Sequence, residues 1–396
     1  IDERIIKEIT DTLLSGWLTT GKKTKLFEEK IKNYTGCQSV LCVSSATEGL
    51  ELVLRWFGVG SGDEVILPAY TYAATANVII HCGATPVFVD VNRDDFNISI
   101  ESIKNAITDK TKVIIPVDMG GLPCDYKEIL NLTFEKKGIF RSENEVQKKF
   151  KRILVLSDAA HSFGAKYSGM QTGVLGDITV FSFQVFKNIT TAEGGAICFD
   201  VPNFDNNELY KHFSVFSLQG QTKNAFQKSN TGNWRYDIVD AGYKCNMNDV
   251  CASIGLAAFD YYEGETLAKR KRIFDIYKEN LSGLEWAEVP IYETKNKKSS
   301  YHIFLFRIKN ITEKQRDLII NELFNRGVLT NVHFVPVPMF TYYKNHLGYD
   351  IKNYPVSYDN YSREITLPVY CDLQDEQINE IISELKWAYQ KWGQKY

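Results

Sequence analysis

Three side chains that could do chemistry follow apolar runs near the middle of the sequence. Asp158 comes after the run 153–156, Ser182 ends the run 178–181, and Lys187 follows five residues later. A lysine amine can bond covalently to the aldehyde of pyridoxal 5′-phosphate (PLP). A carboxylate can pair with the ring nitrogen of that cofactor and keep the ring electron-accepting, and a hydroxyl can donate to its phosphate. The set therefore predicts a PLP site in which Lys187 and Asp158 are catalytic.

Each of these residues also has an ordinary structural explanation when it is considered alone. Asp158 could cap a helix, since a carboxylate at a helix start accepts backbone N–H groups. A lone lysine such as Lys187 is most often a solvated surface residue, because lysine is rarely buried. The PLP prediction depends on the ordered set, in which the glycine pair 194–195 opens a further apolar run at 196–199.

Three motifs carry a resemblance to a known family. DAAH at 158–161, FSF at 181–183 and KNITTAEGG at 187–195 resemble the core of the DegT/DnrJ/EryC1/StrS aminotransferases, and the likeness extends over nearly the whole chain. The resemblance implies PLP-dependent transamination of a nucleotide-linked keto sugar, with glutamate as the amino donor and C4 as the preferred position of the ketone. Some relatives are dehydratases that carry histidine in place of the lysine, and Lys187 argues against that branch.

The resemblance also implies further cofactor-binding residues. Ala46 and Thr47 lie at the start of a predicted helix, whose free N–H groups and positive dipole end suit a phosphate; the alternative there is an ordinary Ser/Thr cap. The family places an aromatic ring that stacks on the cofactor at Tyr72, and a residue near the cofactor's ring hydroxyl at His161. Lys244, where asparagine is commoner, matches a residue that reaches the phosphate of the other subunit, so we expect a homodimer with shared active sites.

Two further histidines, His302 and His333, match family positions. Their roles stay open between contact with the substrate and structural duty. Gln184 stands where relatives often have histidine, which changes the polar contacts near Lys187 but leaves the nucleophile in place.

The order of elements predicts the fold class. Apolar strands alternate with amphipathic helices up to about residue 200, which indicates an α/β fold with a mostly parallel sheet between helices. The resemblance implies the PLP-dependent transferase fold of type I, with a seven-stranded-type sheet in a large domain (1–260) and a smaller α+β domain (261–396). Predicted strands outside the site motifs are 40–43, 64–67, 86–89, 113–117, 300–308 and the strand-like 331–336. Predicted helices include 99–107, 248–280, 313–326 and 375–392, whereas 131–152 is expected to be a surface helix or loop and 204–235 a mobile loop.

Composition excludes several other classes of protein. The chain has 396 residues and a net charge of −3, which gives no sign of nucleic-acid binding. No apolar run reaches the roughly 18 residues needed to span a bilayer, and no histidine or cysteine cluster has metal-binding spacing. The eight cysteines are scattered, and we expect reduced thiols in a cytoplasmic protein.

Two alternative functions stay open from the sequence. One is an aminotransferase that acts on a keto-cyclitol instead of a nucleotide sugar. The other is a non-catalytic regulator with the PLP-enzyme fold, although no DNA-binding motif or basic stripe supports it.

Overall fold

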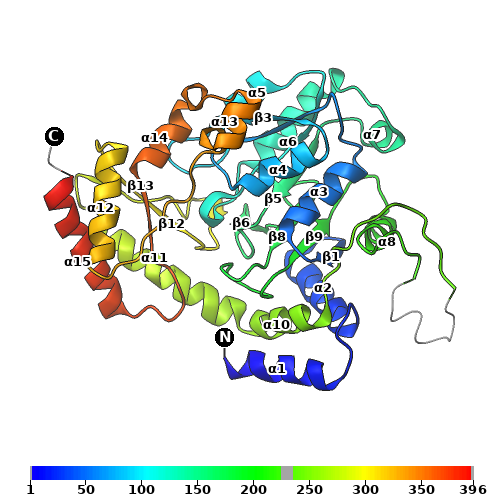
Figure 1. Cartoon of the computed structure of the whole chain (residues 1–396), viewed down its shortest axis with the longest axis horizontal. Helices are drawn as coiled ribbons and strands as arrows, with labels where there is room; N and C mark the ends of the chain where they lie inside the picture. Colours follow the sequence, from blue (N-terminus) through cyan, green and yellow to red (C-terminus); the bar gives the residue numbers. More distant parts are fainter. Residues whose placement is uncertain (1, 224–234, 394–396) are drawn as a thin grey trace.

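A seven-stranded sheet forms the centre of the molecule, shown in the computed structural model of Figure 1, which describes residues 2–223 and 235–393. Strand β9 is antiparallel to both of its neighbours, whereas the other pairings in the sheet are parallel. The predicted α/β fold with a mostly parallel sheet is therefore confirmed. In sheet order the strands are β1 (Ser39–Val43), β9 (Gly195–Phe199), β8 (Ile178–Ser182), β5 (Leu154–Asp158), β4 (Thr111–Ile114), β2 (Glu64–Pro68) and β3 (Thr85–Val89).

Helices cover both faces of this sheet, which is why its strands are mostly apolar. Successive side chains of a strand point to opposite faces, so Leu41 and Val43 of β1 join one core, whereas Val40 and Cys42 join another. The first core includes α3, α4 and α8, and the second includes α2 and α10. The helices are α1 (Glu3–Leu14), α2 (Lys22–Thr35), α3 (Ala46–Trp56), α4 (Ala73–His81), α5 (Ile100–Ala106), α6 (Tyr126–Glu135), α7 (Glu145–Phe150), α8 (Asn206–Phe216) and α10 (Asp249–Asp260).

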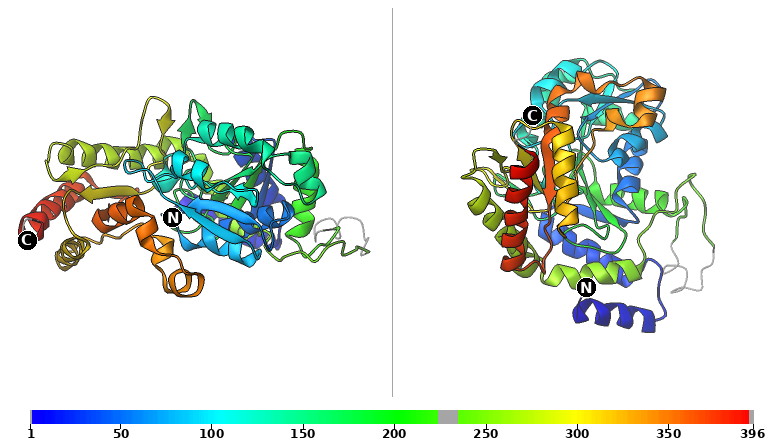
Figure 2. Two further views of the ribbon diagram at one scale, coloured as in Figure 1. Left: turned by 90° about the horizontal axis from the view of Figure 1, so that it is seen from above. Right: turned by 60° about the vertical axis from the view of Figure 1, so that its left-hand side comes forward.

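A second sheet and its helices form a separate apolar core near the C-terminus. Its strands β10 (Ala287–Glu288), β12 (Phe304–Ile308) and β13 (Glu364–Leu367) are antiparallel. Helices α12 and α15 lie together at one side of the molecule in both views of Figure 2. The C-terminal helices are α11 (Ala268–Leu281), α12 (Glu313–Asn325), α13 (Thr341–Leu347), α14 (Pro355–Arg363) and α15 (Asp375–Trp392).

The connection between the two parts is helical, as predicted. Helix α10 leads into a π-helical turn, Tyr262–Leu267, and then into α11. Val337, Tyr343 and Tyr354 return from the C-terminal third to pack in the core of the first sheet. We propose residues 1–260 and 261–396 as the two domains, with this returning segment docked on the first.

Two predictions of local structure are wrong. Residues 206–216, predicted as part of a mobile loop, form α8; Asp205 caps it by accepting from the N–H groups of Asn207 and Glu208, and Leu209 and Phe213 are buried. The rest of that predicted loop includes 224–234, which lie outside the described residues. The segment 331–336 forms no strand and pairs only through an isolated bridge between Asn331 and Thr366.

Smaller differences concern the ends of elements. Only Phe304–Ile308 of the predicted strand 300–308 is a strand, and β4 ends at Ile114. The segment 131–152 contains the end of α6 and the short α7. All eight cysteines are free thiols in the structure. Within the described residues, none of the helices has the length and apolar character needed to cross a membrane.

A buried ion pair fixes the two strands that carry the site. The guanidinium of Arg152 donates to both carboxylate oxygens of Asp177 at 2.7 and 2.6 Å, and the N–H of Val155 donates to the same carboxylate at 2.8 Å. Asp177 immediately precedes β8, and Val155 lies in β5. The pair therefore sets the register between β5 and β8.

We expect Asp177→Ala to destabilise the protein by about 3–5 kcal/mol, because Arg152 is left charged and buried without its partner. Urea unfolding followed by circular dichroism measures the change. The matched control is the double variant Arg152→Met with Asp177→Leu, which removes both charges and should lose less stability than the single variant. An unchanged midpoint for Asp177→Ala would contradict the expectation.

Candidate active site

A cavity of about 530 Å³ opens at the carboxyl ends of β5 and β8, where ligands bind in sheets of this kind. This volume is within the range of small-molecule sites. Its walls come from both parts of the chain, because His302 and Ile303, just before β12, and His333 and Phe334, after α12, line it together with residues of the first part. The lining residues are Ser45, Ala46, Thr47, Leu50, Thr71, Tyr72, Ala74, Thr75, Val117, Asp158, Ala160, His161, Ser182, Gln184, Phe186, Lys187, Glu193, Gly194, His302, Ile303, His333 and Phe334.

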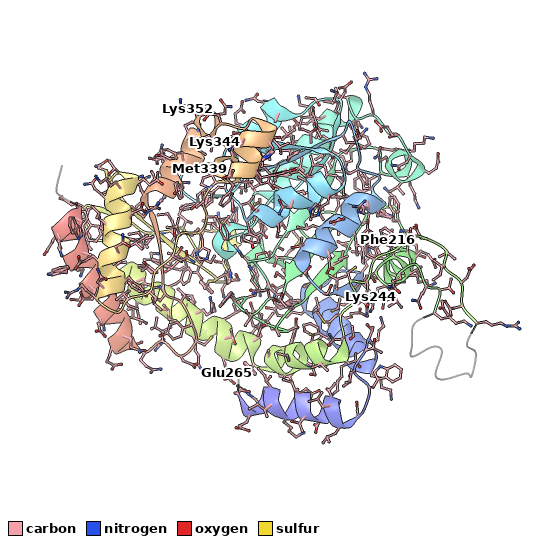
Figure 3. The ribbon with its side chains drawn as sticks, in the orientation of Figure 1. Phe216, Lys244, Glu265, Met339, Lys344 and Lys352 are labelled. Atoms are coloured by element: carbon pink, nitrogen blue, oxygen red, sulfur yellow. The ribbon has the colours of Figure 1, made fainter. Side chains whose placement is uncertain are left out.

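Seven of the eight residues predicted to bind the cofactor line this one cavity. They are Ala46, Thr47, Tyr72, Asp158, His161, Ser182 and Lys187. The eighth, Lys244, is exposed and lies outside it, near Phe216 at the end of α8 (Figure 3). The structure thus brings together the seven residues that were predicted to bind the cofactor of their own subunit. Lys244 was predicted to reach the cofactor phosphate of the other subunit.

Asp158 is held in place at the end of β5. Its Oδ2 accepts a hydrogen bond from Thr75 Oγ1 at 2.9 Å, and its Oδ1 accepts from the N–H of Ala160 at 3.2 Å. Thr71 lies 3.0 Å from Thr75, hydroxyl to hydroxyl. Burial raises the pKa of Asp158, whereas the hydrogen bonds from Thr75 and Ala160 and the charge of Lys187 oppose the rise. A cationic group against this carboxylate would hold it ionised.

Lys187 follows a tight turn after β8. Its backbone N–H donates to the carbonyl of Gln184 at 2.8 Å, so the chain turns and the side chain enters the cavity. Burial lowers the pKa of Lys187 to about 8, and Asp158 opposes this shift. A substantial fraction of the amine is therefore neutral near pH 8, and only the neutral form is nucleophilic.

Three histidines line the cavity and are neutral at pH 7. Burial is the main cause in each case, with Lys187 adding to it. It lowers the pKa of His161 and of His302 well below the usual value, and that of His333 to about 4. The rings of His161 and His302 lie 4.6 Å apart, centroid to centroid. The cavity thus offers imidazole groups that can accept or donate a hydrogen bond without carrying a charge.

The start of α3 forms the end of the cavity suited to an anion. Within the described residues, the N–H groups of Ala46 and Thr47 have no acceptor, because Ser45 caps the helix through Glu48 instead. Gly195 allows this arrangement, since a Cβ there would lie 2.6 Å from the N of Ala46. Free N–H groups at a helix start bind phosphate, and the hydroxyl of Ser182 lines the same cavity.

These residues fit PLP. The Nδ1 atom of His161 is buried without a hydrogen-bond partner, which leaves it available for a polar group of a ligand such as the ring hydroxyl. The acid, the amine and the phosphate-binding helix start are present in one cavity of suitable size. The individual roles of these residues stay predictions.

The sequence did not predict several residues that line the cavity or hold its lining in place. Thr75 donates a hydrogen bond to Asp158, which lies 83 positions later in the sequence. The ring of Phe334 contacts the rings of Tyr72 and His161. Asn188 holds His302, since its Oδ1 lies 2.9 Å from His302 Nδ1 and its Nδ2 donates to the carbonyl of Ser300 at 2.6 Å. The position of Asn188 directly after Lys187 was the one feature of the sequence that could have indicated a role at the site.

Comparison with known proteins agrees with this geometry. Residues 1–386 match the sequence profile of the DegT/DnrJ/EryC1/StrS aminotransferase family. The structure superposes on the putative sugar aminotransferase Spr1654 from Streptococcus pneumoniae, in its PMP form, with a TM-score of 0.95 and 44% identity over 99% of this chain and 98% of that one. The same protein has been solved in PLP and apo forms.

Two relatives with more specific names are each 32% identical to this chain. The spore coat polysaccharide biosynthesis protein SpsC of Bacillus subtilis aligns over 98% of this chain and 94% of its own. The UDP-4-amino-4-deoxy-L-arabinose–oxoglutarate aminotransferase of Shewanella sediminis aligns over 97% and 95%. The predicted type I fold, PLP cofactor and aminotransferase class are thus confirmed, and the chain belongs to the DegT/DnrJ/EryC1/StrS aminotransferase family.

Proposed function

We propose that this protein transfers an amino group from glutamate to the ketone of a nucleotide-linked sugar, with C4 as the position of the ketone, for amino-sugar or surface-polysaccharide biosynthesis. The observation that carries the proposal is the single cavity in which Lys187, Asp158 and the α3 start converge. The name of the Shewanella relative supports a nucleotide-linked 4-amino sugar and the oxoglutarate–glutamate pair.

The chain's own residues would hold the cofactor as follows. The N–H groups of Ala46 and Thr47 and the hydroxyl of Ser182 would bind its phosphate, and Tyr72 would stack on its ring. His161 would face the ring hydroxyl, and Asp158 the ring nitrogen. When bound, PLP supplies an electron-accepting ring that stabilises negative charge on a substrate carbon.

Lys187 would then serve both as covalent anchor and as proton carrier. Its neutral amine takes the proton from the α-carbon of the amino donor and, in the second half of the reaction, gives a proton up at the sugar carbon. Asp158, which accepts a hydrogen bond from Thr75, would stay ionised and pair with the ring nitrogen of the bound cofactor. Burial around Lys187 keeps its amine partly neutral at working pH.

The pH dependence of Lys187 can be tested without the cofactor. We expect the rate of acetylation of Lys187 by acetic anhydride to rise through a midpoint near pH 8, because burial lowers its pKa to about that value. Mass spectrometry of the Lys187 peptide measures the rate. The peptide of exposed Lys148 controls for loss of the reagent; a Lys187 rate with no inflection near pH 8 would contradict the expectation.

The proposed active enzyme is a homodimer in which Lys244 of one copy reaches the phosphate site of the other. Exposed Lys244 and the apolar surface at the cavity mouth support this. Phe186 is 81% exposed, Tyr72 63% and Val185 51%, and exposed apolar patches of this kind mark interaction surfaces.

We expect light scattering after gel filtration to give twice the mass of the chain. Phe186→Asp should shift the population toward the monomer, whereas the exposed Phe324→Asp on α12 should not. A monomeric active wild type would contradict the dimer.

A panel of substrates tests the function itself. Nucleotide-linked keto sugars, with UDP and dTDP and with the ketone at C3 or C4, are each incubated with glutamate, and the aminated products are detected by mass. Amination of a keto-cyclitol alone would favour the alternative function from the sequence. A cytoplasmic location is part of the proposal, and cell fractionation tests it.

A further inference from the structure

Strand β13 carries two polar side chains on the face that points away from the C-terminal core. Ile365 and Leu367 join that core, so Glu364 and Thr366 lie on the opposite face. Glu364 is fully buried. A buried carboxyl group in such a position calls for an explanation, because its ionised form is costly to desolvate.

Glu364 is linked to the cavity through two hydrogen-bonded groups. Its Oε1 lies 2.6 Å from Thr366 Oγ1, and Thr366 Oγ1 lies 2.9 Å from Nδ1 of His333. The other oxygen, Oε2, accepts from the backbone N–H of His333 at 3.0 Å. His333 lines the cavity, and Nε2 is its ring nitrogen not engaged by Thr366. The order is therefore cavity, His333, Thr366, Glu364.

The single hydroxyl proton of Thr366 makes this chain directional. If Glu364 is ionised, Thr366 donates to it and must accept from His333, so the proton sits on Nδ1 and Nε2 presents a lone pair to the cavity. If Glu364 is protonated, it donates to Thr366, which donates to Nδ1, and Nε2 carries the proton. The protonation state of Glu364 thus decides whether His333 accepts or donates in the cavity.

We propose that Glu364, Thr366 and His333 form a proton relay, in which a proton taken up at His333 Nε2 is stored on Glu364 while the imidazole returns to neutrality. The steps balance: Nε2 gains a proton from a substrate ammonium, Nδ1 passes its proton to Thr366, and Thr366 passes its own to Glu364. Glu364 and Thr366 are positioning residues, since neither touches the substrate.

The relay suits a cavity that receives two chemically different substrates in turn, and in this respect it rests on the proposed function. An amino donor arrives as an ammonium and must lose a proton before its nitrogen can attack. The described residues of the cavity wall include no arginine that could bind a donor carboxylate. Once the proton is stored on Glu364, His333 Nε2 carries a hydrogen and can donate it to that carboxylate. With Glu364 ionised, Nε2 accepts from a sugar hydroxyl.

The charges around the relay agree with storage on Glu364 instead of on His333. Burial raises the pKa of Glu364 to about 8, against the hydrogen bonds from Thr366 and the backbone N–H of His333 and the charges of Arg316 of α12 and Arg307 of β12. Tyr70 also lies near the Glu364 carboxyl, and its hydroxyl donates to the carbonyl of His333 at 2.8 Å. On the cavity side, burial and Lys187 hold the pKa of His333 near 4.

The test reads the tautomer of His333 by ¹⁵N NMR in substrate-free protein labelled at its six histidines. The signal is assigned by its loss in His333→Gln. We expect the proton to lie on Nε2 at low pH and to move to Nδ1 as the pH rises through about 8. One tautomer from pH 6.5 to 9.5 would overturn the proposal, and this result does not depend on which substrate the enzyme uses.

Variants separate the relay from a merely structural role. In Glu364→Gln the amide oxygen accepts from the His333 N–H, so the amide NH₂ donates to Thr366; we expect Nε2–H at every pH. Thr366→Val removes the hydroxyl between Glu364 and His333 and should abolish the change of tautomer with pH, whereas Thr366→Ser keeps both.

Stopped-flow spectra should show the amino-donor half-reaction of Glu364→Gln slowed by about 100-fold, with Thr366→Ser near wild type. A Thr366→Val protein that keeps the change of tautomer would overturn the relay.

Discussion

Replacing Lys187 by alanine should lower the rate of transamination by at least about 10⁴-fold, the upper range for a general acid–base group. Lys187 is assigned two duties, as covalent anchor of the cofactor and as proton carrier, and alanine removes both. The side chain lies in the cavity beside Asp158, which raises its pKa against the effect of burial. Single-turnover absorbance with PLP and glutamate measures the loss, because the two cofactor forms absorb differently.

Two controls separate loss of chemistry from loss of fold. Lys187→Arg keeps a positive charge but cannot supply a neutral amine near pH 8, so it should be as inactive as the alanine variant. Lys148→Ala on the surface helix α7 should keep full activity. Borohydride treatment of the wild type should fix the cofactor to the Lys187 peptide; a fully active Lys187→Ala protein would refute the assignment.

The parts of the site that the sequence predicted are those encoded locally. Asp158 and Ser182 end strands and Lys187 follows five residues after the second, all within 30 positions of one another, and parallel strands bring their carboxyl ends to the same edge of a sheet. The helix start at Ala46 and Thr47 was recognisable from its small and hydroxyl-bearing residues. For such residues, local pattern and family motif point to the same place.

The parts that the sequence did not predict depend on contacts between distant segments. Thr75 and Glu364 have no unusual neighbours in the sequence, and their partners Asp158 and His333 lie 83 and 31 positions away. Helix α8 was misjudged for a different reason. Its polar composition suggests a loop, but two aromatic or aliphatic side chains four residues apart suffice to dock it on the sheet, and Asp205 caps its start.

Replacing Asp158 by asparagine should slow transamination by about 10² to 4 × 10³-fold. Removing one partner of a buried charge pair costs about 3–5 kcal/mol, and about 1.4 kcal/mol corresponds to a factor of ten in rate. The asparagine keeps the size of the side chain and its hydrogen bond from Thr75, but it cannot keep a buried ring nitrogen in its cationic form.

The matched control is Thr75→Val, which removes one hydrogen bond of 2.9 Å and should slow the reaction by only about tenfold. Steady-state rates with the best sugar of the panel, measured at saturating PLP, distinguish slower chemistry from weaker cofactor binding. Equal losses in the two variants would mean that Asp158 acts by hydrogen bonding alone, and the assignment of its charge to the ring nitrogen would then be wrong.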